Sequence, residues 1–333
     1  MGSVATRLAE VAKYAGFSEA TVSRVLRDVP GIGEDTRNAV LTALDVLGYQ
    51  RPARHRRELG SLVGMVLPDL HNPIFPAYAE AMAGALVRRQ LIPVLCTRTA
   101  DGVSEAHYIE MLLARKVAGI VFVGASYADA GPEQAKALRA RRLPIVLINE
   151  ADENLGVPRV GVDDTVAVDL AVTHLRELGH KRIGLIVGPR GHVPSERKLA
   201  EFRRLVDGAD RQKLVAHTMF SIAGGQTAIG PLLEAGATAA VCASDTLALG
   251  AIRGARKQGL KVPEQLSVVG FDDSVYMPMM DPPLTTVRQP IGAIGVAAVN
   301  SLVAQIERRP VTLDEELFEP ELIVRDSTAA CPE

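Results

Sequence analysis

The sequence predicts a small all-α helix-turn-helix domain followed by an α/β core of two doubly wound parallel-sheet lobes. Residues 1–50 contain three short amphipathic segments, the pattern of a compact helical unit. From residue 61 onward, apolar strands alternate with amphipathic helices in two series of similar size. A chain of 333 residues, 47% of them apolar, is long enough to bury more than one core.

The three N-terminal helices have recognisable start and stop signals. Thr6 is expected to cap the segment LAEVAKYA, Gly16 to end it, and Ser18 to cap EATVSRVL. A third helix is expected in EDTRNAVLTALDVLGY, which begins with acids that suit the helix dipole and stops at Gly48. The predicted apolar faces are formed by Ala20, Val22, Val25 and Leu26 in the second helix, and by Ala39, Val40, Ala43, Leu44 and Leu47 in the third.

A helix, a tight turn and a second helix suit DNA recognition, because the second helix is free to enter a major groove. Its N-terminal residues then reach base edges, while its Ser and Thr hydroxyls meet phosphates. A small three-helix unit also serves as a protein-docking module in other proteins. The pattern by itself leaves both interpretations open.

The stretch RPARHRRELG, residues 51–60, connects the two parts of the chain. Arg51, Arg54, Arg56 and Arg57 occur there with no acid between them. Such a basic stretch attracts phosphate through counterion release. A solvated linker is the alternative interpretation.

The α/β core is predicted from its alternating segments. Strands are expected at 61–69, 92–97, 119–124 and 144–150, and in a second series at 182–188, 214–220, 239–245 and 266–272. Helices are expected at 75–89, 104–116, 165–179, 195–206 and 246–259. The run AGGQTAIG at 223–230 is predicted to start a helix and not to cradle a phosphate.

Polar side chains follow several predicted strands, where ligands bind in open parallel sheets. They are Asp69, Asn72, Asn149, Ser244, Asp245, Asp272 and Asp273. Carboxylates and amides in pairs satisfy sugar hydroxyls, and an aromatic face such as Phe75 covers the CH surface of a sugar ring. Taken singly, any one of these polar residues is better explained as a helix N-cap or a solvated loop residue than as a ligand-binding residue. Asp245, before TLALG, is better interpreted as a cap than as a ligand.

Several functional classes are excluded by missing signals. The chain has no GxxxxGK[ST], HExxH, GxSxG or strand-associated GxGxxG motif, so it is not predicted to be an enzyme. Cys96, Cys242 and Cys331 are far apart and lack metal-ligand spacing, so neither a disulfide framework nor a metal or other cofactor is expected. No signal peptide is apparent, and no stretch approaches the roughly 20 apolar residues of a membrane span. A cytoplasmic protein is expected.

The segments RLAEVAKYAGFSEATVSRVL and TRNAVLTALDVLGY resemble the DNA-binding domain of the lactose-repressor (LacI/GalR) family of bacterial transcription regulators. The resemblance continues through GMVLPDLHNPIF, HLRELGHKRIGLI, CASDTLALGA, LSVVGFDD and PPLTTVRQP, and so covers nearly the whole chain. It implies a periplasmic-binding-protein-like core whose chain crosses between lobes near residues 160, 288 and 320. The implied parts are a helix-turn-helix domain at 1–50, an Arg-rich hinge at 51–60, an N-terminal lobe at 61–160 plus 289–320, and a C-terminal lobe at 161–288 plus 321–333.

The resemblance also assigns roles to individual residues. Glu19 and Ala20 open the recognition helix, and Arg24 is the expected guanine reader. The full DNA-contacting set is Thr6, Ser18, Glu19, Ala20, Thr21, Ser23, Arg24, Thr36, Arg54, Arg56 and Arg57. The effector-contacting set is Asn72, Phe75, Asn149, Arg197, Lys198, Ser244, Asp272 and Gln289. Lys198 stands where the family often has an arginine, and Arg197 is the candidate replacement for that arginine.

The hinge departs from the family pattern YxPNxxARxL, because QRPARHRRELG is shorter and Arg56 occupies the position of the wedge leucine. Arginine does not open a base step, but it binds a narrow minor groove. We therefore expect Arg54 and Arg56 to bind the minor groove or flanking phosphates with less bending of the operator. The alternatives are that Leu59 serves as the wedge after a register shift, or that the segment is disordered.

The function expected from these features is that of a dimeric repressor that binds a palindromic operator under the control of a sugar or oligosaccharide. Segments 73–90 and 275–285 are the expected helical dimer interface, and the C-terminus lacks the heptads of a tetramer-forming coiled coil. The short hinge and the run GHVPSERK resemble maltose-repressor-like regulators from high-GC bacteria, which favours an oligosaccharide inducer. A corepressor-dependent regulator of the purine type and a solute-binding sensor without operator binding remain as alternatives.

Overall fold

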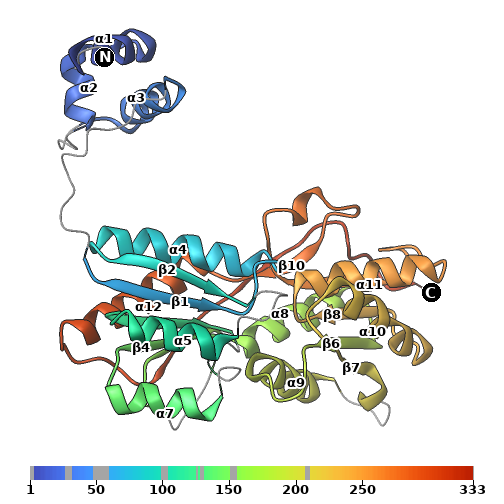
Figure 1. Ribbon diagram of the computed structural model, residues 1–333. Helices are drawn as coiled ribbons and strands as arrows, with labels where there is room; N and C mark the ends of the chain where they lie inside the picture. The colour runs from blue at the N-terminus through green and yellow to red at the C-terminus, as the bar shows by residue number, and fades with distance from the viewer. Residues whose placement is uncertain are drawn as a thin grey trace. The chain divides into compact units, whose positions relative to one another are not determined.

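The computed structural model describes residues 4–26, 32–47, 60–98, 104–124, 127, 131–150, 156–206 and 211–332. The chain divides into two compact units, Met1–Leu59 and Gly60–Glu333. The first holds three helices and the second holds two sheets with their covering helices (Figure 1). The Arg-rich hinge lies outside the described residues.

The N-terminal unit is a helix-turn-helix with a third packing helix. Helix α1 spans Val4–Ala15, α2 spans Glu19–Leu26 and α3 spans Glu34–Val46. Its core is formed by Val11, Ala12, Val22, Val25, Val40, Ala43 and Leu44. The expectation that Thr6 caps the first helix is wrong, because the helix already begins at Val4. Gly16 ends this helix with φ at +74°, a conformation that glycine adopts without strain.

Ser18 caps the second helix as predicted, because its Oγ accepts the backbone N–H of Thr21 at 3.2 Å. The prediction of apolar faces was too broad. Ala20, Ala39 and Leu47 are exposed, while Val22 and Val40 are fully buried. Three short helices enclose only a narrow core, so only the central positions of each apolar stripe reach it.

The first lobe of the larger unit is a parallel sheet. Its strands are β1 (Leu62–Leu67), β2 (Ile92–Thr97), β3 (Gly119–Val123), β4 (Ile145–Ile148), β5 (Arg159–Val162) and β11 (Glu315–Phe318), in the order β11-β5-β4-β3-β1-β2. Its helices are α4 (Ile74–Arg88), α5 (Glu105–Ala114), α7 (Pro132–Arg141) and α12 (Ile291–Ile306). Continuous apolar runs such as LVGMVL and GIVFV form these strands because a parallel sheet is covered on both faces.

The second lobe repeats this architecture. Its strands are β6 (Ile183–Val187), β7 (Val215–His217), β8 (Ala239–Cys242), β9 (Ser267–Asp272), β10 (Thr285–Arg288) and β12 (Glu321–Ile323), in the order β12-β10-β9-β8-β6-β7. Strand β12 is antiparallel to β10, and the other pairs are parallel. Its helices are α8 (Asp164–Glu177), α9 (Val193–Leu205), α10 (Ile222–Glu234) and α11 (Asp245–Lys257). Helix α10 contains residues 223–230, as predicted.

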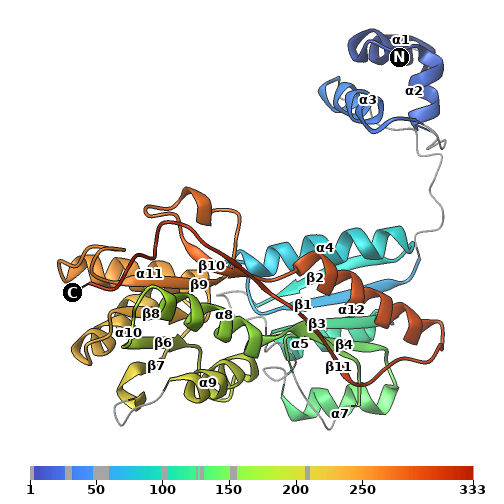
Figure 2. The ribbon, with the colours of Figure 1, turned by 180° about the vertical axis from the view of Figure 1, so that it is seen from behind.

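Three connections join the two sheets. The chain leaves the first sheet after β5, returns between β10 and α12, and leaves again between β11 and β12. Figure 2 shows the last of these connections in red, running from β11 toward the C-terminus. Three covalent links between two lobes are the arrangement of a hinge, around which such lobes open and close.

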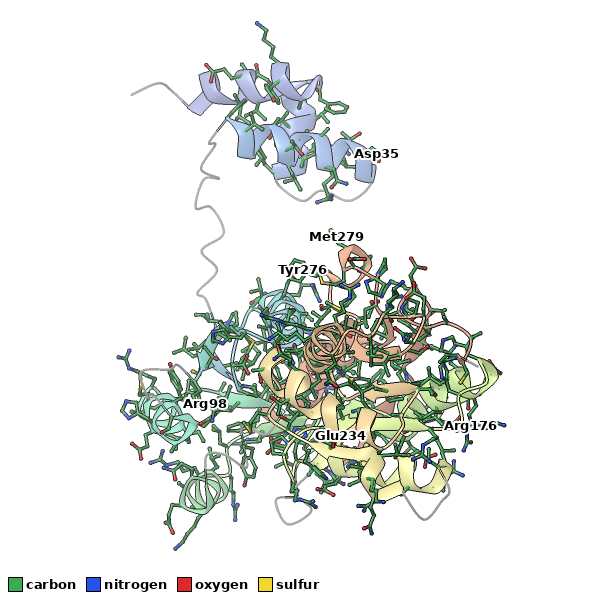
Figure 3. All side chains as sticks on the ribbon, turned by 90° about the vertical axis from the view of Figure 1, so that its right-hand side faces the viewer. Asp35, Arg98, Arg176, Glu234, Tyr276 and Met279 are labelled. Atoms are coloured by element: carbon green, nitrogen blue, oxygen red, sulfur yellow. The ribbon has the colours of Figure 1, made fainter. Side chains whose placement is uncertain are left out.

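The segment 275–285 is not the helix that the sequence suggested. It contains one short 3₁₀ turn, Met277–Met279, because Pro278, Pro282 and Pro283 lack the N–H groups that a longer helix needs. Val275, Tyr276 and Met279 are nevertheless exposed, whereas Met277 and Leu284 are buried. Figure 3 shows Tyr276 and Met279 at the surface of the larger unit. Within the described ranges, no helix is both long and apolar enough to cross a membrane.

Candidate functional site

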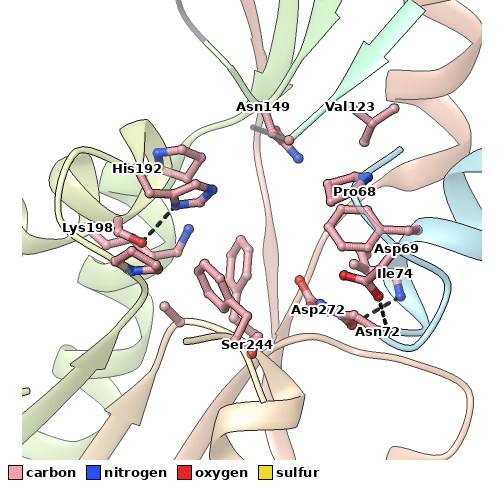
Figure 4. A pocket seen from close by; sticks show the side chains of 18 of the residues that line it. Pro68, Asp69, Asn72, Ile74, Val123, Asn149, His192, Lys198, Ser244 and Asp272 are labelled. Carbon is pink, nitrogen blue, oxygen red and sulfur yellow. Dashed lines mark hydrogen bonds between the residues drawn. The ribbon is translucent and has the colours of Figure 1, made fainter. Parts of the chain in front are cut away.

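A cavity of about 630 Å³ lies between the two lobes (Figure 4). Its walls are formed by residues that follow the carboxyl ends of strands in both sheets, where ligands bind in open α/β folds. Seven residues of the predicted effector set line it: Asn72, Phe75, Asn149, Lys198, Ser244, Asp272 and Gln289. The volume is in the range of small-molecule binding sites.

Arg197 of the predicted set does not line this cavity. Its guanidinium instead donates two hydrogen bonds of 2.7 Å to the carboxylate of Glu315, on β11 of the other lobe. The Glu315 carboxylate raises the pKa of Arg197. The bidentate pair therefore joins α9 to the first sheet, and Arg197 is not free to replace the family arginine.

A buried hydrogen-bond network crosses the floor of the cavity. The Tyr78 hydroxyl donates to Oε1 of Gln289 at 2.9 Å. Nδ2 of Asn149 donates to the Tyr78 hydroxyl oxygen at 3.1 Å and to Oε1 of Gln289 at 3.2 Å. Nε2 of Gln289 donates to Oδ1 of Asp272 at 2.7 Å. The network thus fixes the orientation of both amides and connects the two lobes.

Asp272 has one carboxylate oxygen in this network and one without a partner. Its Oδ2 is buried and makes no hydrogen bond within the described part of the chain. Burial raises the pKa of Asp272, and the nearby Asp245 raises it further. A buried acceptor that is left unpaired costs free energy, so it favours a ligand that donates a hydrogen bond there.

Backbone conformation places two of these side chains. Asn149 has φ at +53° and Asp272 at +120°, values that L-residues adopt only when the surroundings enforce them. Oδ1 of Asn149 accepts the N–H of Val162 at 3.0 Å, which anchors the amide to β5. A Cβ at position 161 would lie 2.9 Å from that Oδ1, so Gly161 leaves the space that Asn149 occupies.

Lys198 is buried and paired. Its Nζ donates to Oδ1 of Asp164 and lies 3.8 Å from the centroid of the Phe271 ring. Burial raises the pKa of Asp164, although Lys198 acts in the opposite direction. The positive charge is therefore largely neutralised before any ligand enters the cavity.

Aromatic side chains provide the apolar part of the wall. Phe75 was predicted in this role, and the structure adds Phe220 and Phe271. Both follow the rule applied to polar residues, because Phe220 comes shortly after β7 and Phe271 lies near the end of β9. Neither phenylalanine was predicted, because only polar residues at strand ends were considered as ligand contacts.

The prediction that Asp245 caps the following helix is wrong. Ser244 is the N-cap of α11, since its Oγ accepts the N–H of Leu247 at 3.2 Å. Asp245 does not line the cavity either. Its two carboxylate oxygens accept hydrogen bonds from the Thr286 hydroxyl at 2.6 Å and the Ser274 N–H at 2.8 Å.

This buried carboxyl predicts a pH dependence of stability. Burial raises the pKa of Asp245 to about 7. Between about pH 4 and 7 the unfolded chain releases this proton while the folded protein retains it, so the free energy of unfolding falls as pH rises. Because the pKa rises by about three units and each unit is worth about 1.4 kcal/mol, we expect this group to contribute a loss on the order of 4 kcal/mol. Urea titrations at several pH values should show a smaller loss in D245N, and an equal loss in both proteins would contradict this assignment.

The second candidate site is the outer face of α2. Val22 and Val25 point into the core, while Glu19, Ala20 and Arg24 are exposed. Thr21 is half-buried, and its hydroxyl lies 2.9 Å from that of Ser18. Ser23 and Thr36 are also half-buried. The side chain of Thr6, and Arg54, Arg56 and Arg57 entirely, lie outside the described residues.

Metal-ligand geometry does not occur in the parts of the chain that the structure describes, where no group of three His, Cys, Asp or Glu residues is placed to hold an ion.

Known proteins match both the part of the chain that holds α2 and the part that holds the cavity. Residues 7–52 match the model for bacterial regulatory proteins of the lacI family, and residues 172–328 match that for a periplasmic binding protein-like domain. The HTH-type transcriptional regulator reg1 of Streptomyces lividans is 49% identical, over 98% of this chain and 98% of that protein. The HTH-type transcriptional regulator MalR of Streptomyces coelicolor is 48% identical over the same shares, 98% and 98%.

Two solved structures are similar over nearly the whole chain. The cellobiose complex of the transcriptional regulator CelR has a TM-score of 0.71 at 28% identity, covering 96% of this chain and 99% of that one. The Lac repressor dimer bound to operator and the anti-inducer ONPF has a TM-score of 0.68 at 26% identity, covering 96% and 98%.

Proposed function

Because the chain belongs to the LacI family and is a DNA-binding transcriptional regulator, not an enzyme, we propose that it represses transcription as an operator-bound homodimer controlled by a neutral sugar. The sugar is an oligosaccharide that enters the cavity between the lobes and weakens operator binding. We propose a cytoplasmic location, because the operator DNA that the protein would bind lies there.

The proposal of a sugar effector rests on the unpaired Oδ2 of Asp272, in a cavity that three phenylalanine side chains line. A sugar hydroxyl donates to such an acceptor, while aromatic rings cover the CH faces of the sugar. The formal charges of the lining balance, because Asp69, Asp164 and Asp272 stand against Arg98, Arg190 and Lys198. A balanced lining favours an uncharged ligand over a phosphate or a carboxylate. The similar CelR structure contains a neutral disaccharide, cellobiose.

DNA binding is assigned to the exposed face of α2. Its buried Val22 and Val25 fix the helix to the core, and Glu19, Ala20 and Arg24 remain accessible to base edges. Ser18, Thr21, Ser23 and Thr36, together with Thr6, are proposed to contact phosphates. Arg54, Arg56 and Arg57 are proposed to contact the minor groove or flanking phosphates.

A dimer is proposed because one recognition helix reads too few base pairs for specificity, whereas two related by a dyad read a palindrome. Exposed apolar side chains on the outer surface of the larger unit are suitable for such an interface. They include Val87 on α4, Leu95 on β2, and Val275, Tyr276 and Met279. The similar Lac repressor structure is a dimer bound to its operator.

The test combines selection of DNA with a sugar panel. Full-length protein should select dyad-symmetric sites from a random duplex pool, and maltose, maltotriose or cellobiose should raise its Tm where glucose 6-phosphate does not. The bound sugar should weaken the selected site several-fold to a hundredfold at constant salt, the usual range of allosteric coupling of about 1–3 kcal/mol. Selection of no site above nonspecific binding would contradict the proposal, and a sugar that strengthens binding would make the protein a corepressor-dependent regulator.

The role of Arg24 predicts a specific change in DNA recognition. R24A should weaken the selected site by about 1–3 kcal/mol and relax the base preference at one position in each half-site, because a bidentate contact to guanine is lost. Competition binding against the four single-base variants of that position measures both effects. K13A on α1 is the matched control, and any loss it causes should be equal for all four sequences. An unchanged base preference in R24A would contradict the assignment.

A further inference from the structure

His192 lines the cavity. It is not among the predicted effector residues and takes no part in the hydrogen-bond network on the cavity floor. It precedes α9, and its ring lines the cavity together with Lys198. Figure 4 shows these two side chains across the cavity from Asp69, Asn72 and Asp272. The imidazole and the Phe220 ring pack in a T-shaped arrangement, with 5.1 Å between ring centroids.

Ser195 fixes the protonation of the imidazole. Its Oγ accepts the backbone N–H of Gly188 at 3.1 Å and lies 2.9 Å from Nδ1 of His192. Ser195 is 1% exposed, so its single hydroxyl hydrogen needs an acceptor within the protein. Among the described groups, that acceptor is Nδ1. Nδ1 is therefore unprotonated, and the hydrogen of the neutral ring is on Nε2.

The imidazole stays neutral near pH 7. Burial lowers the pKa of His192 to about 4, and the Lys198 ammonium acts in the same direction. The ring therefore presents an uncharged N–H donor, unlike the positive charge of an arginine. Such a donor satisfies a hydroxyl, ring or glycosidic oxygen but gives no charge pairing to a phosphate.

We propose that His192 is a specificity-determining residue of the effector site, whose Nε2–H donates to an uncharged acceptor oxygen of the ligand. Ser195 is the positioning residue that fixes the tautomer and ring orientation. The inference rests on the proposed function and deepens it, because the ligand must offer an acceptor to His192 and a donor to Oδ2 of Asp272. A sugar carries donors and acceptors on opposite edges of its ring, which makes this pair selective for a polyhydroxylated ligand.

The first test needs no ligand. Nitrogen-15 NMR of full-length protein labelled at histidine should show His192 as the neutral Nε2–H tautomer at pH 7, with the signal identified by its absence in H192F. S195A should convert that signal to a mixture of tautomers, while S221A, which also alters a serine of the cavity lining, should not. An Nδ1–H tautomer or a doubly protonated ring in the unaltered protein would overturn the proposal.

The second test measures maltose and cellobiose binding by calorimetry. H192F should weaken the tighter of the two at least tenfold, because it keeps the ring but removes the donor. H192Q should stay within about threefold of the unaltered protein, because its amide nitrogen occupies nearly the place of Nε2 and donates in the same way. If H192F binds the sugar as tightly as the unaltered protein does, the proposed role of His192 is overturned. If the unaltered protein binds neither sugar yet shows the expected tautomer, the sugar effector of the proposed function is overturned while the fixed donor is supported.

Discussion

K198M should lower the free energy of unfolding of the unit Gly60–Glu333 by about 3–5 kcal/mol at pH 8. Lys198 and Asp164 are both almost completely buried, with side-chain exposures of 5% and 4%. Methionine fills a similar volume but leaves the Asp164 carboxylate buried without its counter-charge. Chemical denaturation followed by circular dichroism measures the loss.

The pH dependence identifies the cause of this loss. Burial already raises the pKa of Asp164, and removal of Lys198 should raise it further. Stability of the variant should therefore fall more steeply than that of the unaltered protein as pH rises, so the deficit at pH 5 should be smaller than at pH 8. The double variant K198M/D164N should recover most of the loss, since it carries no buried unpaired charge.

An exposed ion pair provides the control for K198M. Arg309 and Glu307 are 56% and 52% exposed, so R309M should change stability by less than about 1 kcal/mol. A deficit in K198M that is independent of pH and unaffected by D164N would show that lost packing on Phe271, and not the buried charge, is responsible.

The second large effect is expected in D272N. This substitution keeps an acceptor for Gln289 but replaces the free Oδ2 with an amide, which does not accept from a sugar hydroxyl. Loss of one partner of a buried hydrogen bond costs about 1–3 kcal/mol, so maltose or cellobiose affinity should fall roughly 5- to 150-fold. Operator affinity without sugar should stay unchanged, and release by sugar should require correspondingly higher concentrations.

D272N should also be more stable than the unaltered protein when no sugar is present. The buried Oδ2 lacks a partner and burial raises the pKa of Asp272, so a neutral amide removes a cost that the empty site carries. A higher Tm together with weaker sugar binding distinguishes a ligand contact from general damage. D281N is the control, because that carboxylate is 95% exposed. Unchanged sugar affinity in D272N would exclude Asp272 from the effector site.

Local sequence signals were reliable where local interactions decide the outcome. Ser18 was predicted to cap α2, and its Oγ accepts the N–H only three residues away. The strands β1, β3, β4, β6, β8 and β9 were predicted from their continuous apolar runs. Such runs are typical of strands that are covered on both faces of a sheet. Strands β5, β10, β11 and β12 were not predicted. EELF and ELI of β11 and β12 are short, charged and partly exposed at sheet edges, so they lack a continuous apolar run.

The recognition helix, the two-lobed core, most of its buried strands and the strand ends that line the cavity follow from the sequence, because residue spacing and turn chemistry act over a few neighbouring positions. Which polar groups are paired within the protein and which stay free depends on long-range contacts. Arg197 pairs with Glu315, 118 positions away, and Tyr78 bonds Gln289 at a separation of 211. Those pairings depend on how the lobes meet, and they leave Oδ2 of Asp272 and Nε2 of His192 for a ligand.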